Sequence, residues 1–316
     1  MKRLQTRLPA RGPVATVVAL ACAVLAACGG GGSSDTADDG AEQALASAPA
    51  DSSSATSVSQ ESTSASASTL QTTQAVVATG GAGQAVNCPG GGTAQYQLSG
   101  GADDGQLSAG EVYAITFTRC TGPYELVSLT GTATLTVTEA TPTRVAADMA
   151  LNSLVAQTPL AQLTHTGDAS VVTNVNYGHD GPVLNGTIST RFTSSSLAVV
   201  RHTASRNTAY TLSAVDITHG TVVAGGLVTS TSVAGTSTLT ASLPAGTYTA
   251  TFSSQGGVQF DDGVPVAGAW QVRGPRNTLL LSATPQAITV GLDLGSNGTV
   301  DFTRTYPSAD WAGSSY

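Results

Sequence analysis

Two acidic loops carry oxygen-bearing side chains at the spacing of a calcium site. In the first, residues 100–111, Asp104, Ser108 and Glu111 fall at positions 5, 9 and 12 of the twelve-residue calcium loop. Positions 1 and 3, where that loop normally has carboxylates, are a glycine and an alanine, so two hard oxygen ligands are missing. The sequence therefore favours a turn whose Asp and Ser side chains cap the backbone, and calcium is the alternative.

The second loop, residues 293–301, has the same ambiguity. Asp293, Asn297 and Asp301 fall at positions 1, 5 and 9, but position 12 is Arg304, a cation where a bidentate glutamate belongs. An Asn-Gly pair between two alternating runs is typical of a hairpin turn. A turn is again favoured over calcium, and the sequence predicts no other metal site and no cofactor.

Residues suited to acid–base catalysis are few. The histidines are His165, His179, His202 and His219. None lies in a known catalytic motif, since the chain has no Gly-x-Ser-x-Gly, no His-Glu-x-x-His and no phosphate-binding loop. Asp216 and His219 are close in sequence, but on a strand they project from opposite faces. We therefore expect a protein that is not an enzyme; a catalytic set assembled from distant serines is the alternative.

The first 28 residues have the layout of an export signal. A basic start precedes an apolar run of roughly 15 residues, shorter than the ~20 that a membrane-spanning helix needs. The run ends in Leu-Ala-Ala-Cys at Cys28, which resembles the lipobox of bacterial lipoproteins. That resemblance implies a signal peptide at 1–27, a diacylglycerol on the Cys28 thiol and, because Gly29 comes next in place of aspartate, sorting to the outer membrane. An uncleaved anchor or a secreted protein is the alternative, and Cys22 is a competing acceptor in a poorer context.

We expect residues 28–84, which begin with the lipidated cysteine, to form a disordered tether. The stretch is almost wholly Gly, Ser, Ala, Thr and Gln, with six acidic residues and no basic one. Such a composition buries too little apolar surface to offset the entropy of ordering the chain. A flexible coil of this length spans about 40 Å, so the sequence predicts a spacer between the lipid and a folded domain.

The two remaining cysteines, Cys88 and Cys120, are expected to form a disulfide. A cysteine pair in an exported chain is typical of a structural bridge. The loop that it closes gives a stabilisation of about 3.5 kcal/mol in the chain-entropy description. Two free thiols or half of a metal site are the alternatives, but no Cys-x-x-Cys and no histidine at ligand spacing supports a metal.

Residues 85–316 are expected to form one all-β domain. Runs such as 111–118 and 132–138 alternate polar and apolar residues with period two, as half-buried strands do. Residues 144–157 are compatible with a helix by propensity, but their neighbours are strands, so we favour a strand. The sequence predicts an antiparallel meander of about a dozen strands, curved into an open barrel or a sandwich.

A recurring glycine motif predicts where that sheet curves. An apolar residue, a variable residue, a glycine and a small residue recur at the expected starts of strands. These glycines are Gly131, Gly186, Gly235 and Gly268. Because glycine inside a strand usually marks a bulge or a sharp bend, each of them is expected at a curve of the sheet.

Three short motifs frame the domain. A Cys…Asp-Gly-x-Leu-Ser-x-Gly-Glu…Cys stretch runs from Cys88 to Cys120, and an Asn-Gly-x-x-Asp ending at Asp301 and a final Trp311 lie near the C-terminus. Together they resemble a group of uncharacterised proteobacterial outer-membrane lipoproteins. The resemblance implies a lipid-anchored, β-rich protein and no particular activity. The chain departs from the group's pattern where the first acidic loop lacks its leading carboxylates, so a metal role in the group need not extend to this chain.

Charge and composition narrow the function classes. The formal net charge is −8 and the only lysine is Lys2, so the chain repels phosphate backbones and nucleic-acid binding is not expected. We expect a lipid-anchored cell-envelope protein with a non-enzymatic structural or interaction domain. Its partners are the membrane, through the lipid, and an unidentified protein or small ligand. The alternatives are a binder or carrier of a small apolar ligand within the curved sheet and, less favoured, an envelope hydrolase.

Overall fold

The structure, a computed structural model, describes most of the chain after residue 57. The described residues are 58–59, 61–122, 127–158, 161–180, 183–203, 207–225, 227–243, 246–261 and 264–308. The predicted signal peptide, the predicted lipidation site Cys28 and Trp311 lie outside them. Within the described part of the chain, no helix is both long enough and apolar enough to cross a membrane.

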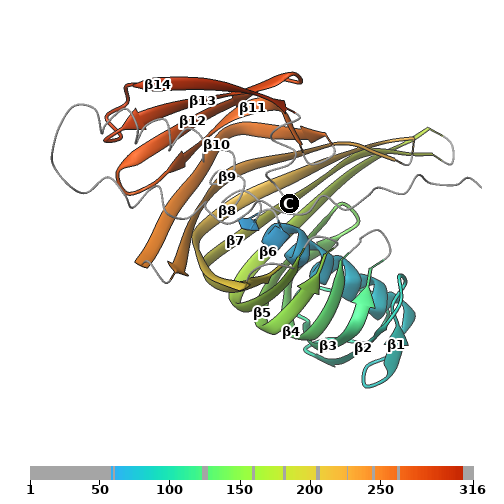
Figure 1. The fold of residues 1–316 in the computed structure, drawn as a ribbon. Helices are drawn as coiled ribbons and strands as arrows, with labels where there is room; N and C mark the ends of the chain where they lie inside the picture. Colours follow the sequence, from blue (N-terminus) through green and yellow to red (C-terminus); the bar gives the residue numbers. More distant parts are fainter. Residues whose placement is uncertain are drawn as a thin grey trace, which may run out of the picture.

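Fourteen antiparallel strands form one continuous sheet, in which each strand pairs with its neighbours in the sequence (Figure 1). The strands are β1 (Ala85–Asn87), β2 (Thr93–Ser99), β3 (Val112–Thr121), β4 (Ser128–Thr141), β5 (Arg144–Gln157), β6 (Gln162–Asp180), β7 (Val183–His202), β8 (Asn207–Ala224), β9 (Leu227–Leu243), β10 (Gly246–Asp261), β11 (Val264–Arg273), β12 (Asn277–Ala283), β13 (Ala287–Leu294) and β14 (Phe302–Pro307). β1 and β14 are its two edges, and the sheet curls into a barrel-like arrangement. The predicted all-β meander is confirmed, including the strand over 144–157.

Alternating side chains explain why these segments are strands. In β3, the side chains of Tyr113, Ile115 and Phe117 are buried, whereas the residues between them are exposed. Threonine fills many of the outward positions, and its β-branched side chain suits a pleated, half-buried surface. The inward rows of all fourteen strands supply one connected hydrophobic core. The period-two pattern therefore fixes which face of the sheet is the inner one.

The curvature comes from a row of bulges that crosses the sheet. Every pair from β3–β4 to β10–β11, except β7–β8, has a register shift. Gly131, Gly235 and Gly268 lie at or beside these shifts, with φ angles of 114°, 119° and 104°, which confirms three of the four glycine predictions. The prediction was wrong for Gly186, which pairs regularly with Tyr177 and Val223.

Gly235→Ala is expected to lower the free energy of unfolding by more than about 2 kcal/mol. A Cβ at this position would clash with the backbone carbonyl oxygen of Asp216, and the positive φ is itself unfavourable for alanine. Gly256→Ala is the matched control, because a Cβ there meets no atom within 4 Å. Urea unfolding of both variants measures the difference, and equal stabilities would contradict the bulge argument.

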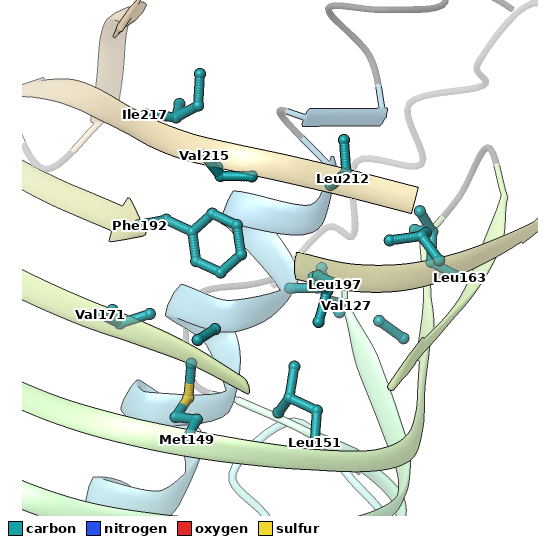
Figure 2. Close-up of a cluster of buried hydrophobic side chains, with 14 of the residues drawn as sticks. Val127, Met149, Leu151, Leu163, Val171, Phe192, Leu197, Leu212, Val215 and Ile217 are labelled. Atoms are coloured by element: carbon teal, nitrogen blue, oxygen red, sulfur yellow. The ribbon is translucent and has the colours of Figure 1, made fainter. Parts of the chain in front are cut away.

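A helix occupies the concave side of the sheet, where the sequence had predicted a tether. Residues 61–79 are α-helical, residues 58–59 are helical too, and most of their side chains are buried. Figure 1 shows this helix, in blue, inside the curve of the sheet, and Figure 2 shows Met149, Phe192, Leu197 and other core side chains around it. The prediction of a disordered tether up to residue 84 is therefore wrong over 61–79. The physical reason is that the sheet supplies the apolar surface that the segment lacks.

Candidate functional site

The most unusual feature of the molecule is the contact between this helix and the concave face of β2–β9, called here the inner groove. The helix crosses the groove obliquely. Near its start, Ser59 hydrogen-bonds Ser237 of β9 through their hydroxyl oxygens, 2.8 Å apart. Just after its end, the carbonyl of Gly80 accepts a hydrogen bond from the Tyr96 hydroxyl of β2, at 3.0 Å. The helix therefore spans the groove from one side to the other.

An ion pair joins the helix to β7 inside this contact. The guanidinium of Arg201 donates to both carboxylate oxygens of Glu61, at 2.8 and 2.9 Å. Their side chains are only 19% and 13% exposed, so water screens the pair much less than a surface salt bridge. The hydrogen bond to Glu61 raises the pKa of Arg201 against the opposing effect of burial. If either partner is lost, the other is left as a partly buried, unpaired charge.

A second polar contact lies next to this pair, between His165 of β6 and Ser62 of the helix. The Nε2 of His165 lies 3.1 Å from the Ser62 hydroxyl oxygen, and both residues are buried. Burial lowers the pKa of His165 to about 4, because the charged imidazolium would lose its hydration. The imidazole is therefore neutral at neutral pH.

The helix also carries buried hydroxyls into a largely apolar groove. The buried serines and threonines are Ser59, Ser62, Thr63, Ser66, Ser68, Thr69, Thr72 and Thr73. Three of the four buried threonines, Thr63, Thr69 and Thr73, donate to backbone carbonyls four residues earlier, at 2.7 to 2.8 Å. The hydroxyls of Ser66, Ser68 and Thr72 have no hydrogen-bond partner among the described residues. Each costs about 1–3 kcal/mol relative to a hydrated hydroxyl.

The other histidines form no catalytic arrangement among the described residues. His202 lies 2.8 Å from the amide oxygen of Asn207. His219 lies opposite the buried Thr190 in the pairing of β7 with β8. Asp216 instead binds Arg191 on the exposed side of the sheet, at 2.7 Å. Asp216 and His219 therefore point to opposite faces, as predicted. The side chain of His179 lies outside the described residues.

The first acidic loop uses its carboxylates to hold its own backbone. Asp104 accepts a hydrogen bond from the Gln106 amide at 3.0 Å. Glu111 is buried and accepts from the Ser108 amide at 2.7 Å and from the Tyr113 hydroxyl at 2.6 Å. Burial, reinforced by the bond to Glu111, raises the pKa of Tyr113. This is the capped turn that the sequence favoured, and Ser108 takes part through its backbone.

The second acidic loop has the same kind of capping. Asp293 is buried and accepts from the amides of Asn297 and Gly298, at 2.9 and 2.8 Å. Asp301 accepts from the Leu294 amide at 2.7 Å, and the side chain of Asn297 accepts from the Thr299 amide at 2.8 Å. No group of three or more metal-ligating His, Cys, Asp or Glu side chains occurs among the residues described. Calcium remains the alternative, and thermal melting in its presence distinguishes the two.

Glu111→Ala is expected to lower the free energy of unfolding by about 2–3 kcal/mol, because it removes a buried charged acceptor from the buried Tyr113 hydroxyl and from the Ser108 amide. Asp104→Ala is the control in the same loop, with an expected loss below about 1 kcal/mol, since its single bond is exposed. Addition of calcium is expected to leave the melting temperature of the wild type unchanged. A rise in melting temperature that disappears in Glu111→Ala would establish calcium binding instead.

The disulfide prediction is confirmed. Cys88 and Cys120 are bonded, with their Cα atoms 5.4 Å apart, and both are buried. The bridge ties the segment before β2 to the end of β3. It therefore fixes the edge of the sheet at which the helix ends.

The outer face of the sheet has a separate hollow. An open groove of about 660 Å³ lies over β4–β8, close to the row of bulges. Exposed side chains from Thr134, Thr136, Asp148 and Asp168 contribute to its lining, and Asp148 accepts a hydrogen bond from Ser170 at 2.5 Å. This outer groove is lined by both polar and apolar side chains and is open to solvent, in contrast to the inner groove.

Comparisons with protein families, curated proteins and solved structures found no match to this chain.

Proposed function

We propose that the chain is a lipid-anchored protein of the bacterial outer membrane whose β-domain is a non-enzymatic interaction module. The lipobox-like sequence that ends at Cys28 supports the anchor. One observation supports the proposal that the β-domain is an interaction module: the chain's own helix fills the concave side of the sheet (Figure 2). The outer face, with its open groove, is therefore the surface that is available to a partner.

The position of the serine–histidine contact argues against the hydrolase alternative. Ser62 and His165 are 3.1 Å apart, as a nucleophile and its base would be, but each is at most 1% exposed. A substrate has no route to this contact while the helix is in the groove. The contact is best explained as a structural one, in which each side chain satisfies the other.

The filled inner groove also argues against a carrier with a preformed cavity. Such a carrier needs apolar space inside the curved sheet. Here the side chains of Phe192, Leu197 and Met149 lie against the helix rather than around an open space (Figure 2). An apolar ligand would have to displace the helix.

Lipidation at Cys28 is tested by fractionating cells that express the wild type, Cys28→Ala or Cys22→Ala. We expect the wild type and Cys22→Ala to enter the membrane fraction and to take up a clickable palmitate label. Cys28→Ala is expected to lose both the label and the membrane association. Persistence of Cys28→Ala in the membrane fraction would overturn the proposed anchor.

The interaction module is tested by photo-cross-linking in cells. A photoreactive residue at Thr134, in the outer groove, is expected to give a discrete cross-linked product. The same residue at Gln97, an exposed position of β2 outside this groove, serves as the control. Identical patterns at the two positions, or none at either, would count against the outer groove as an interaction surface.

A further inference from the structure

The helix and the inner groove are poorly matched in chemistry. A helix that buries most of its surface is normally apolar over the buried part. This helix has few large apolar side chains, and the hydroxyls of Ser66, Ser68 and Thr72 are buried without a partner among the described residues. The wall opposite is aliphatic and aromatic, with Leu163, Phe192 and Leu197 fully buried (Figure 2). A chain of methylene groups packs against such an apolar surface more favourably than a row of hydroxyls does.

The helix packs into the core through a few apolar side chains, Leu70, Val76 and Val77 among them, but its side-chain hydrogen bonds and its ion pair to the sheet are concentrated at its N-terminal end. They are the bonds from Ser59 to Ser237, from Glu61 to Arg201 and from Ser62 to His165. At its other end the helix continues through residues 80–84 into β1, and this connection includes two consecutive glycines. Release of the N-terminal part therefore needs the loss of these three contacts and of the apolar packing of Val58 and Ala65, while the chain stays connected at the glycines.

Arg201 indicates what else the groove binds. Its carboxylate partner is on the helix, so displacement of the helix leaves the Arg201 guanidinium at the apolar wall without the anion that it pairs with. Tyr210 interacts with Arg201, and the neutral His165 contacts Ser62, the residue after Glu61; neither is a carboxylate that could replace Glu61. The groove thus combines one cation at an end with a long apolar wall.

We infer that the helix is a displaceable plug and that the inner groove binds an anionic acyl-chain lipid. The carboxylate or phosphate head replaces Glu61 at Arg201, and the acyl part replaces the helix along the wall. Arginine suits either head because its planar guanidinium forms paired hydrogen bonds with both. This inference goes beyond the proposed interaction module, because it concerns the inner face rather than the outer one.

The two members of the ion pair give opposite predictions. The test uses the full chain with Cys22→Ala and Cys28→Ala, so that no lipid is attached, and measures binding of radiolabelled palmitate. Glu61→Gln is expected to raise the affinity about tenfold, because the plug is held less firmly and the binding-competent state is more populated. Arg201→Gln is expected to lower it about tenfold, because the anionic head loses its partner. A purely structural ion pair would move both variants in the same direction, and that result would overturn the inference.

A disulfide that ties the helix to β9 provides a second test of the inference. Ser59→Cys with Ser237→Cys places two thiols where the hydroxyl oxygens are 2.8 Å apart, and the resulting disulfide holds the plug in place. The locked chain is expected to lose palmitate binding, which a reductant restores; each single-cysteine variant, and the reduced wild type, serve as controls. Binding by the locked chain equal to that of the controls would overturn the inference, as would absence of binding by every unlocked chain.

Two further ligands identify the source of the head group. Phosphatidylglycerol presented in mixed micelles tests a phosphate head, and the methyl ester of palmitate tests whether the charge is needed. Binding of palmitate alone assigns a fatty acid, and tighter binding of phosphatidylglycerol assigns a phospholipid. Binding of the methyl ester as tight as that of palmitate would contradict the role of Arg201. None of these results depends on Cys28 lipidation or on the outer groove, so they are separable from the proposed function.

Discussion

A chain that begins at residue 85 is expected to be unfolded or aggregated under conditions in which the full chain unfolds cooperatively. Without the helix, large inner side chains such as Phe192, Leu197 and Leu163 become exposed to water. Each contributes about 1.5–3 kcal/mol when it is buried, and the net stability of a domain is only about 5–15 kcal/mol. Circular dichroism during heating, together with size-exclusion chromatography, measures the effect.

A chain that begins at residue 58 is the matched control, because it keeps the helix and omits the residues before it. It is expected to melt at the same temperature as the full chain. A separate peptide of residues 58–79 is expected to restore part of the stability when it is added to the shorter chain. If the chain from residue 85 melted like the full chain, the helix would not be part of the folded core.

The second large effect is a loss of stability in mild acid that depends on His165. Its pKa is about 4 in the folded protein and about 6.5 in the unfolded chain, so the unfolded chain binds the proton first. The stabilisation is complete above pH 6.5 and is lost as the pH falls towards 4. It amounts to about 3 kcal/mol, from the difference between the two pKa values.

Urea unfolding between pH 7 and pH 4 measures this slope. Burial also lowers the pKa of His219, which contributes in the same direction. The carboxylates with lowered pKa values, Asp103 and Asp216, lose their contribution only at lower pH. His165→Leu is therefore expected to flatten the profile but not to abolish it, and an unchanged slope in this variant would contradict the assignment to His165.

The sheet was predictable from the sequence because its information is local. Alternation within each run of eight or so residues indicates a strand, and short connections that mostly contain Gly, Pro, Asn or Asp separate consecutive strands. A meander joins neighbours only, so its topology is determined once the strands are known. The Cys88–Cys120 bridge joins residues near the ends of neighbouring strands, and the carboxylates of Asp104 and Asp293 cap turns within a few residues of themselves.

The helix was missed because its stability is not local. Its sequence has no apolar face, and composition alone assigns such a stretch to a spacer. One signal was present: residues 50–79 contain neither glycine nor proline, unlike the stretch before them, and Gly80 and Gly81 come directly after. That pattern permits a helix with a glycine stop, but only the groove stabilises it.

The inner contacts were not predictable for a related reason. Glu61 and Arg201 are 140 residues apart, and Ser62 and His165 are 103 residues apart. Glu61 was counted only as an acidic residue of the tether, and His165 only as one of four scattered histidines. Without the curl of the sheet, nothing in the sequence brings these side chains together.

The same separations impose an order on folding. Ser59 meets Ser237 across 178 residues, so the first described segment of the chain finds its last polar partner only after nine strands have formed. Contacts between residues so distant form late, because the entropy of closing such loops must be overcome before they contribute. The helical segment, which is synthesised before any of the fourteen strands, is thus secured near the end. Until then its exposed hydroxyls keep it hydrated, and a more apolar helix would instead offer a surface for aggregation during that interval.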